Sequence, residues 1–160
     1  MAAIELFDRR SQRSVPIALF LIALALLVAR FAYAPKQEST TGLVRWVEAE
    51  AAVALARSTG KPILYDFTAE WCDPCHVLDA EVFGDDVAAR QINERFIPVR
   101  ITDRQQEDGR NPPEVAALEK QYSVRGFPTV VFVAPNGSEV GRMEGYKGRE
   151  ELLRIMERVR

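Results

Sequence analysis

The sequence DFTAEWCDPC, residues 66–75, decides the fold of this chain and contains both of its cysteines. Its first three residues end a mostly apolar run that predicts a buried strand over residues 61–68, and a helix is predicted from Pro74 to about Phe83. A thiol at such a junction faces the unpaired backbone N–H groups of the helix N-terminus, which favour a thiolate. We therefore predict that Cys72 is the attacking sulfur. Cys75, one turn further along, can attack Cys72 and resolve a mixed disulfide.

The composition of the chain fits one globular domain and one short extra element. It has 160 residues, of which 48% are hydrophobic and 28% charged, with a formal net charge of -2. This balance suggests neither a nucleic-acid-binding protein nor a disordered one. With only two cysteines, three positions apart, a disulfide-stapled fold is excluded, and the pair is expected to act chemically.

The N-terminal part contains an uncharged apolar run, Val15 to Ala29, preceded by an arginine cluster. We expect a cytoplasmic tail over residues 1–14, a signal anchor or signal peptide over 15–34, a linker over 35–42 and a domain over 43–160. A buried helix of a soluble protein is the less favoured alternative.

A cleavage site of small residues is present at Ala32-Tyr33-Ala34, so secretion after cleavage near Ala34 is possible. The long tail before the apolar run favours an uncleaved, single-pass anchor in the inner (cytoplasmic) membrane, with Arg30 snorkelling to the far interface. Either reading places the domain on the periplasmic, extracytoplasmic side.

The domain alternates between strand and helix signals. Strands are predicted at 43–47, 61–68, 96–101, 129–134 and 139–146, and helices at 48–59, 74–83, 85–94 and 149–160. A further helix starts at Asn111-Pro112-Pro113-Glu114, taken as N-cap, first-turn proline and N3 glutamate, after a polar loop at 105–110. Alternation of this kind predicts an α/β fold with a central mixed β-sheet flanked by helices.

Three motifs in order, DFTAEWCDPC, Gly126-Phe127-Pro128-Thr129 and Gly145, resemble the thioredoxin superfamily. The resemblance runs from about Leu43 to the C-terminus. It is greatest to membrane-anchored periplasmic thioredoxin-like proteins and to the C-terminal domain of transmembrane thiol:disulfide interchange reductases. It implies a thioredoxin fold, here preceded by one N-terminal hydrophobic helix, and a redox-active disulfide between Cys72 and Cys75.

The resemblance also assigns roles to single residues. Trp71 matches the tryptophan that shields the disulfide, and Asp66 matches the buried carboxylate beneath the resolving cysteine. An Asp inside an apolar strand has its pKa raised by desolvation, which suits Asp66 to take a proton from Cys75. Phe127 and Pro128 match the cis-proline loop.

The expected substrate groove is rimmed by Trp71, Pro74, Phe127 and Gly145, beside Pro128. Its client would be an extended protein segment paired with the backbone of the residue before the proline.

Two departures from the family pattern carry expectations. Asp73-Pro74 replaces the usual Gly-Pro, and a carboxylate beside the thiolate opposes its ionisation, which favours a reductase over an oxidant. Ala80 stands where thioredoxins usually have a helix-kinking proline, so a straighter active-site helix is expected.

Two alternative functions remain open. Cys72-x-x-Cys75-His76 is also the attachment motif of a c-type haem electron carrier, with Met143 or Met156 as a distal ligand. A non-catalytic thioredoxin-like binding module is the other. Zinc is disfavoured, because two cysteines and one histidine supply too few ligands, so no metal site is expected.

The sequence thus predicts an extracytoplasmic thiol:disulfide oxidoreductase, acting as a protein-disulfide reductase through its Cys-x-x-Cys dithiol. It needs no cofactor. The expected partners are disulfides or dithiols of exported proteins, a membrane electron donor, and the membrane itself through the N-terminal helix.

Overall fold

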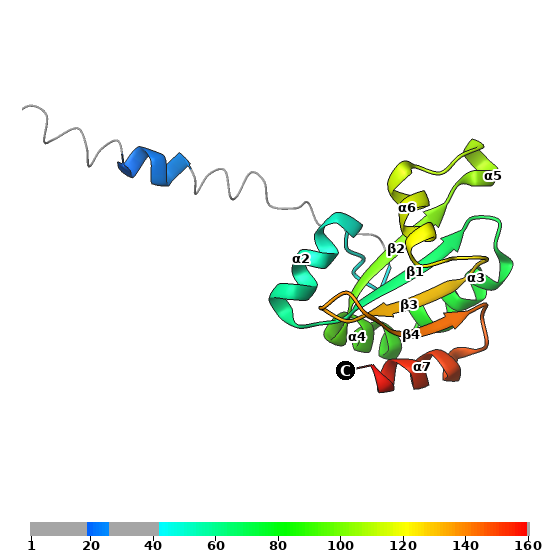
Figure 1. Ribbon diagram of the computed structural model, residues 1–160. Helices are drawn as coiled ribbons and strands as arrows, with labels where there is room; N and C mark the ends of the chain where they lie inside the picture. Colours follow the sequence, from blue (N-terminus) through cyan, green and yellow to red (C-terminus); the bar gives the residue numbers. More distant parts are fainter. Residues whose placement is uncertain (1–18, 26–41, 160) are drawn as a thin grey trace, which may run out of the picture. The chain divides into compact units, whose positions relative to one another are not determined.

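A computed structural model of the chain describes residues 19–25 and 42–159 (Figure 1). The chain forms two compact units, Met1–Lys36 and Gln37–Arg160. In the first unit residues 19–25 are helical, while the remainder of the predicted tail and anchor, and all of the predicted linker except Gly42, lie outside the described residues. Within the described part of the chain, no helix combines the length and the apolar character needed to cross a membrane.

The second unit is built on a mixed four-stranded sheet in the order β2-β1-β3-β4. The strands are β1 (Ile63–Ala69), β2 (Ile97–Asp103), β3 (Thr129–Val133) and β4 (Glu139–Glu144). β1 pairs with β2 in parallel and with β3 antiparallel, and β3 pairs with β4 antiparallel. The predicted mixed sheet is confirmed.

Helices cover both faces of this sheet (Figure 1). Their bounds are α2 (Ala49–Thr59), α3 (Asp73–Leu78), η1 (Asp79–Phe83), α4 (Asp86–Arg95), α5 (Gln105–Asp108), α6 (Pro113–Gln121) and α7 (Arg149–Arg158). α3, η1, α4 and α7 pack on one face against Leu64, Phe132 and Met143. α2 and α6 pack on the other against Tyr65 and Val131.

β1 is the central element of the fold, and all seven of its residues are buried. Side chains of a strand alternate between the two faces of a sheet, and here helices cover both faces. A polar residue in β1 is therefore removed from water whichever way it points. This places Asp66 in the interior of the protein.

The strand predicted at 43–47 is not formed. The segment is irregular: Val44 packs into the core and the Val47 N–H donates to the carbonyl of Pro98 at 2.8 Å. Burial of apolar side chains, rather than strand pairing, explains its hydrophobic pattern.

Two helix predictions need correction at their ends. Helix α6 begins at Pro113, and its N-cap is Pro112 with no side-chain cap. Asn111 instead accepts a hydrogen bond from the backbone N–H of Arg104 at 2.6 Å. The polar loop predicted at 105–110 contains the short helix α5.

The active-site helix is not an uninterrupted α-helix, although Ala80 removes the kinking proline. It changes at Asp79 into the π-helical turn η1, which Gly84 closes by donating its N–H to the Asp79 carbonyl at 2.7 Å. Straightness of this helix does not follow from the missing proline, since π turns interrupt helices too.

Candidate active site

Cys72 and Cys75 lie at the junction of β1 and α3, and their sulfurs form a disulfide with a Cα–Cα distance of 5.2 Å. Cys72 is the N-cap of α3, and the backbone N–H of Cys75 points at the Cys72 sulfur, with the nitrogen 3.2 Å away. Pro74 occupies the first turn, where its missing N–H is no loss. On reduction, the same N–H and the helix N-terminus stabilise a thiolate at Cys72.

Two aromatic residues frame the disulfide. Trp71 is 47% exposed, and its ring meets Phe127 edge to face with centroids 5.9 Å apart. Phe127 also packs against Cys72 and Cys75. Trp71 and Phe127, 56 residues apart in the sequence, thus meet beside the disulfide.

The loop containing Phe127 continues into a cis peptide bond at Pro128. The Pro128 carbonyl accepts a hydrogen bond from the Gly145 N–H at 2.8 Å, at the end of β4. Gly145 has φ +66°, a conformation that glycine adopts without steric cost. The structure therefore links Gly145 to Pro128, while Pro74 lies exposed on the helical side of the disulfide.

Asp66 is buried as predicted, with 1% of its surface exposed. Burial raises its pKa from the ordinary 3.8 to about 6, against the opposing effect of the Arg100 guanidinium. Asp66 Oδ2 accepts from Arg100 Nε at 2.9 Å, whereas Oδ1 is buried and has no hydrogen-bond partner among the described residues. A carboxylate with one oxygen free of hydrogen bonds and a raised pKa can accept a proton.

Arg100 was missed by sequence reasoning. It is the register partner of Asp66 across the parallel pair β1 and β2. Its Cζ lies 4.2 Å from the ring centroid of Trp46 and 5.2 Å from that of Phe83, and its Nη2 donates to Asp79. The signal that could have identified Arg100 is that it is the one charged residue inside the predicted strand 96–101.

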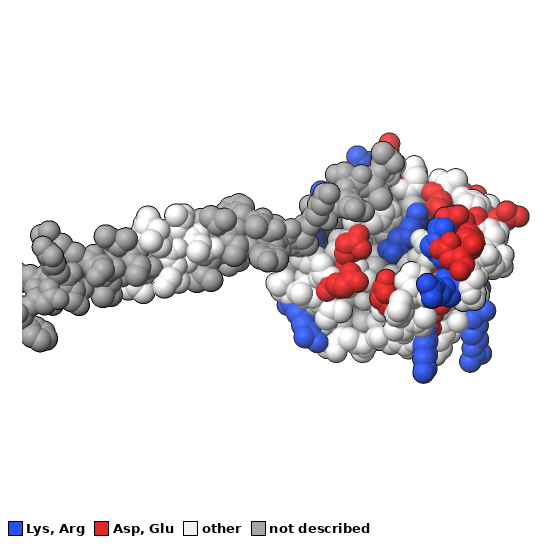
Figure 2. Space-filling view, turned by 90° about the horizontal axis from the view of Figure 1, so that it is seen from above, with Lys and Arg blue, Asp and Glu red and all other residues white. Residues whose placement is uncertain are grey.

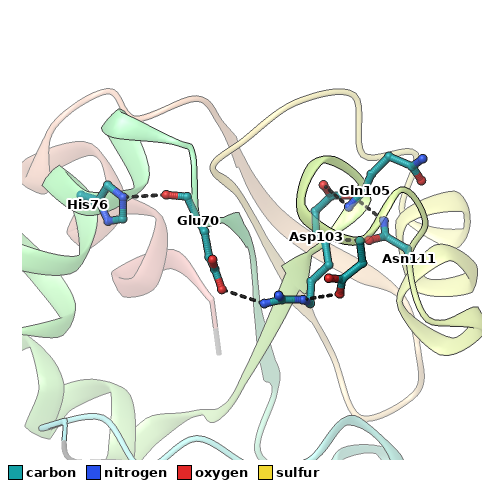
Figure 3. Close-up of polar contacts among 7 residues, drawn as sticks. Glu70, His76, Asp103, Gln105 and Asn111 are labelled. Carbon is teal, nitrogen blue, oxygen red and sulfur yellow. Dashed lines mark hydrogen bonds and ion pairs between the residues drawn. The ribbon is translucent and has the colours of Figure 1, made fainter.

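Glu70 connects the loop before Cys72 to its surroundings (Figure 3). Its backbone carbonyl is 2.9 Å from His76 Nε2, and its carboxylate accepts from Arg104 Nη1 at 2.7 Å. Arg104 also donates to Asp108 at 2.7 Å, in α5. The active-site loop is thereby tied both to α3 and to α5.

Asn111 organises the segment that carries α5. Its Nδ2 donates to Asp103, and the Gln105 N–H donates to Asp103 at 3.2 Å (Figure 3). The Asn111 Nδ2 also donates to Glu119 Oε2 at 2.9 Å. Burial, and next the charge of Asp103, raise the pKa of Glu119. In the part of the chain that the structure describes, no group of three or more His, Cys, Asp or Glu side chains could hold a metal ion.

Surface charges near α5 are mixed rather than segregated. Figure 2 shows acidic and basic side chains next to one another on the face seen from above in Figure 1. Arg104 forms ion pairs with both Glu70 and Asp108. Exposed pairs of this kind fix geometry more than they add stability.

The geometry does not favour haem attachment. The two sulfurs that would form thioethers are bonded to each other, and the ring nitrogen Nε2 of His76 contacts the Glu70 carbonyl. Met143 and Met156, named above as distal ligands, are both buried core residues. In this structure the two cysteines are thus bonded to each other, and the histidine contacts the backbone.

A sequence profile of the thioredoxin-like domain family matches residues 49–160. The chain belongs to this family and, with its Cys72–Cys75 disulfide, is a thiol:disulfide oxidoreductase of thioredoxin type. Among curated relatives it is similar to the thiol:disulfide interchange protein DsbD of Yersinia pestis, with 30% identity over 106 residues. That match covers 64% of this chain but 17% of the relative. DsbD 1 of Pseudomonas aeruginosa is 37% identical over 91 residues, covering 56% of this chain and 14% of the relative.

Solved structures agree with this assignment. The reduced C-terminal domain of Neisseria meningitidis DsbD has 28% identity and a TM-score of 0.55, and the match covers 71% of this chain and all of that domain. A Thermus thermophilus thioredoxin has 31% identity and a TM-score of 0.60, with 71% and 85% covered. The DsbH oxidoreductase, at 20% identity and TM-score 0.61, shares the fold, with 81% of this chain and 98% of that chain covered. The predicted thioredoxin fold and the resemblance to interchange proteins are confirmed.

Proposed function

We propose that this protein is a membrane-anchored, extracytoplasmic reductase of protein disulfides. The observation that carries the proposal is the disulfide between Cys72 and Cys75 at the N-terminus of α3, beside the loop of Phe127 and Pro128. The DsbD relatives are named as thiol:disulfide interchange proteins, and the chain matches about a sixth of their length. Interchange is the chemistry that this site can perform.

The first step is attack by Cys72. In the reduced enzyme its thiolate attacks one sulfur of a client disulfide, a bond forms between Cys72 and that sulfur, and the other client sulfur leaves as a thiolate that water protonates. The backbone N–H of Cys75 stabilises the attacking thiolate.

The second step releases the client. Asp66 takes the proton of the Cys75 thiol, and the Cys75 thiolate attacks the sulfur of Cys72. The Cys72–Cys75 disulfide forms, and the second client sulfur leaves as a thiolate. Two electrons pass from the enzyme dithiol to the client, and the enzyme ends in the disulfide state seen in the structure.

The surface around the disulfide suits a peptide client. Trp71 exposes an aromatic face, Phe127 packs beside the sulfurs, and Gly145 adjoins Pro128 without a side chain. An extended client segment can lie across Pro74 and pair with the backbone of Phe127. The site recognises the backbone and the disulfide, which fits a range of exported clients.

The direction of electron flow is argued from Asp73. Its carboxylate follows Cys72 directly in the first turn of α3 and opposes the ionisation of that thiol. Strong oxidants depend on a stabilised thiolate, so a less stabilised one favours reduction of clients. A reductant in an oxidising compartment must be recharged, which calls for a membrane electron donor as partner.

The extracytoplasmic location is argued from the N-terminal sequence. The predicted anchor over residues 15–34 contains the apolar run Val15 to Ala29 and has the length and flanking arginines of a signal anchor. In its described part, apolar side chains such as Leu19, Phe20 and Ile22 are more than half exposed. Insertion into a bilayer would remove them from water.

Trapping of mixed disulfides tests the proposal. A Cys75→Ser variant expressed with its N-terminal segment should accumulate mixed disulfides with exported proteins through Cys72, because the resolving thiol is absent. The matched Cys72→Ser variant should accumulate far fewer. If neither variant captures a client, direct exchange is contradicted.

A further inference from the structure

We propose that Asp79 is a positioning residue for proton transfer: it takes one arm of the Arg100 guanidinium and thereby leaves Asp66 Oδ1 open to the proton of Cys75. The inference rests on the proposed function, in which Asp66 accepts that proton. It adds a residue outside the Cys-x-x-Cys motif and on the surface of the protein.

Arg100 divides its hydrogen bonds between two carboxylates. A guanidinium beside a carboxylate commonly binds both of its oxygens as a fork. Here Nε binds Asp66 Oδ2 at 2.9 Å, but Nη2 donates to Asp79 instead. Asp66 Oδ1 is left buried and without a hydrogen-bond partner among the described residues. The second carboxylate explains why the fork is incomplete.

The guanidinium is held in place by aromatic rings. Trp46 and Phe83 lie 4.2 Å and 5.2 Å from its Cζ, and the two rings contact each other edge to face. The guanidinium is therefore confined beside Asp66. Its nitrogen atoms can still bind different acceptors. Asp79 is the acceptor that Nη2 binds.

Asp79 is itself placed relative to the active site. It is the first residue of η1, and its backbone N–H donates to the carbonyl of Cys75, one turn earlier. Its side chain is 38% exposed, so its charge stays partly solvated while it binds Arg100. The helix that carries the resolving cysteine thus also carries the group that restrains Arg100.

The consequence for Asp66 follows from electrostatics. If Nη2 bound Oδ1, both oxygens would be occupied and the ionised form would be favoured, which makes a weaker base. The negative charge of Asp79 also raises the pKa of Asp66. Diversion of Nη2 away from Oδ1 and the negative charge of Asp79 both raise the pKa of Asp66. The test must therefore separate the two effects.

The test is a titration of the Asp66 side-chain carboxyl by ¹³C NMR in the full-length oxidised chain in detergent. In this state the cysteines do not titrate, and the charged groups that face Asp66 are Arg100 from β2 and Asp79 from η1. The unmodified chain should titrate near pH 6.

Asp79→Ala should lower the midpoint by about one pH unit or more, since the freed arm can reach Oδ1 and the repulsion is lost. Asp79→Asn loses the charge but keeps an acceptor for Nη2, so its shift should be smaller. Asp79→Ser is a second variant without a suitable acceptor for Nη2. Asp79→Glu keeps both the charge and the acceptor, so its midpoint should stay at that of the unmodified chain. Glu94→Gln, at an exposed carboxylate of α4, is the control and should leave it unchanged.

An unshifted or raised midpoint in Asp79→Ala and Asp79→Ser overturns the inference. Equal shifts in Asp79→Asn and Asp79→Ala also overturn it, because charge alone would then suffice. In single-turnover exchange, Asp79→Ala should slow release of the client several-fold at pH 7 and leave the first attack by Cys72 unchanged. A shifted titration in a chain that exchanges no disulfide overturns the proposed function and the role of Asp79 in its proton transfer, and supports only the hold of Asp79 on Arg100.

Discussion

Replacing the buried carboxylate by its neutral isostere, Asp66→Asn, should stabilise the oxidised protein at neutral pH. The pKa of Asp66 is raised from 3.8 to about 6, because burial outweighs the attraction of Arg100. Each pH unit corresponds to about 1.4 kcal/mol, so the ionised side chain costs the fold about 3 kcal/mol above pH 6. The side chain is 1% exposed, so solvent screens little of this.

The sign follows from linkage. The pKa is higher in the folded than in the unfolded state, so the stability contributed by the protonated group is complete below 3.8 and is lost as the pH rises to about 6. Asparagine resembles the protonated form at every pH. The variant should therefore gain about 3 kcal/mol at pH 7.5 and less than about 1 kcal/mol at pH 4.

Urea unfolding of the oxidised fragment 37–160, a compact unit of its own, measures both values. Asp86→Asn, at an exposed carboxylate of α4, serves as control and should change the free energy of unfolding by less than about 0.5 kcal/mol at either pH. A variant whose effect is the same at pH 4 and pH 7.5, or which destabilises at pH 7.5, would refute the reasoning.

Three further perturbations test other parts of the structure. Trp71→Ala should slow reduction of a protein disulfide several-fold but affect a small disulfide dye little, as stopped-flow assays of the two would show, because the exposed ring offers its surface to a peptide. Gly141→Ala should destabilise the fragment by about 1–3 kcal/mol in urea, since its Cβ would meet a methyl of Ile155 at 3.0 Å, whereas Gly42→Ala, in open space, should not. Arg104→Gln removes two exposed ion pairs and should lower the urea midpoint only slightly, a loss that shrinks further at high salt.

Sequence reasoning performs well where the signal is local. The helix predicted at 48–59 forms as α2, Ala49–Thr59, and ends at Gly60 with φ 72°. The apolar run after it forms β1, and the cysteine pair begins the next helix. Each of these features depends on neighbours within one or two turns, so the local sequence contains the information.

Sequence reasoning fails where contacts are distant. Arg100 lies 34 residues from Asp66, and only the register of β1 and β2 brings them together. The order of strands can be guessed from an alternating pattern, but which residue opposes which cannot. The contact of Arg100 with Trp46 depends in addition on a segment taken for a strand.

Predictions from local residue patterns were also wrong for short irregular segments. Asn111 was taken for a helix cap, yet its side chain binds Arg104, Asp103 and Glu119. A capping residue and a tertiary hydrogen-bonding residue have the same chemistry, so the local pattern does not separate them. The π turn that begins at Asp79 likewise contains no proline or glycine from which it could have been predicted.

The reduction potential of the Cys72–Cys75 couple tests the central claim most directly. The fragment 37–160 would be equilibrated in dithiothreitol and glutathione buffers, and the oxidised fraction measured by alkylation of free thiols. A reductase of protein disulfides predicts a reversible two-electron couple near the thioredoxin value of about -270 mV. A value near -120 mV, or no reversible couple at all, would contradict the account.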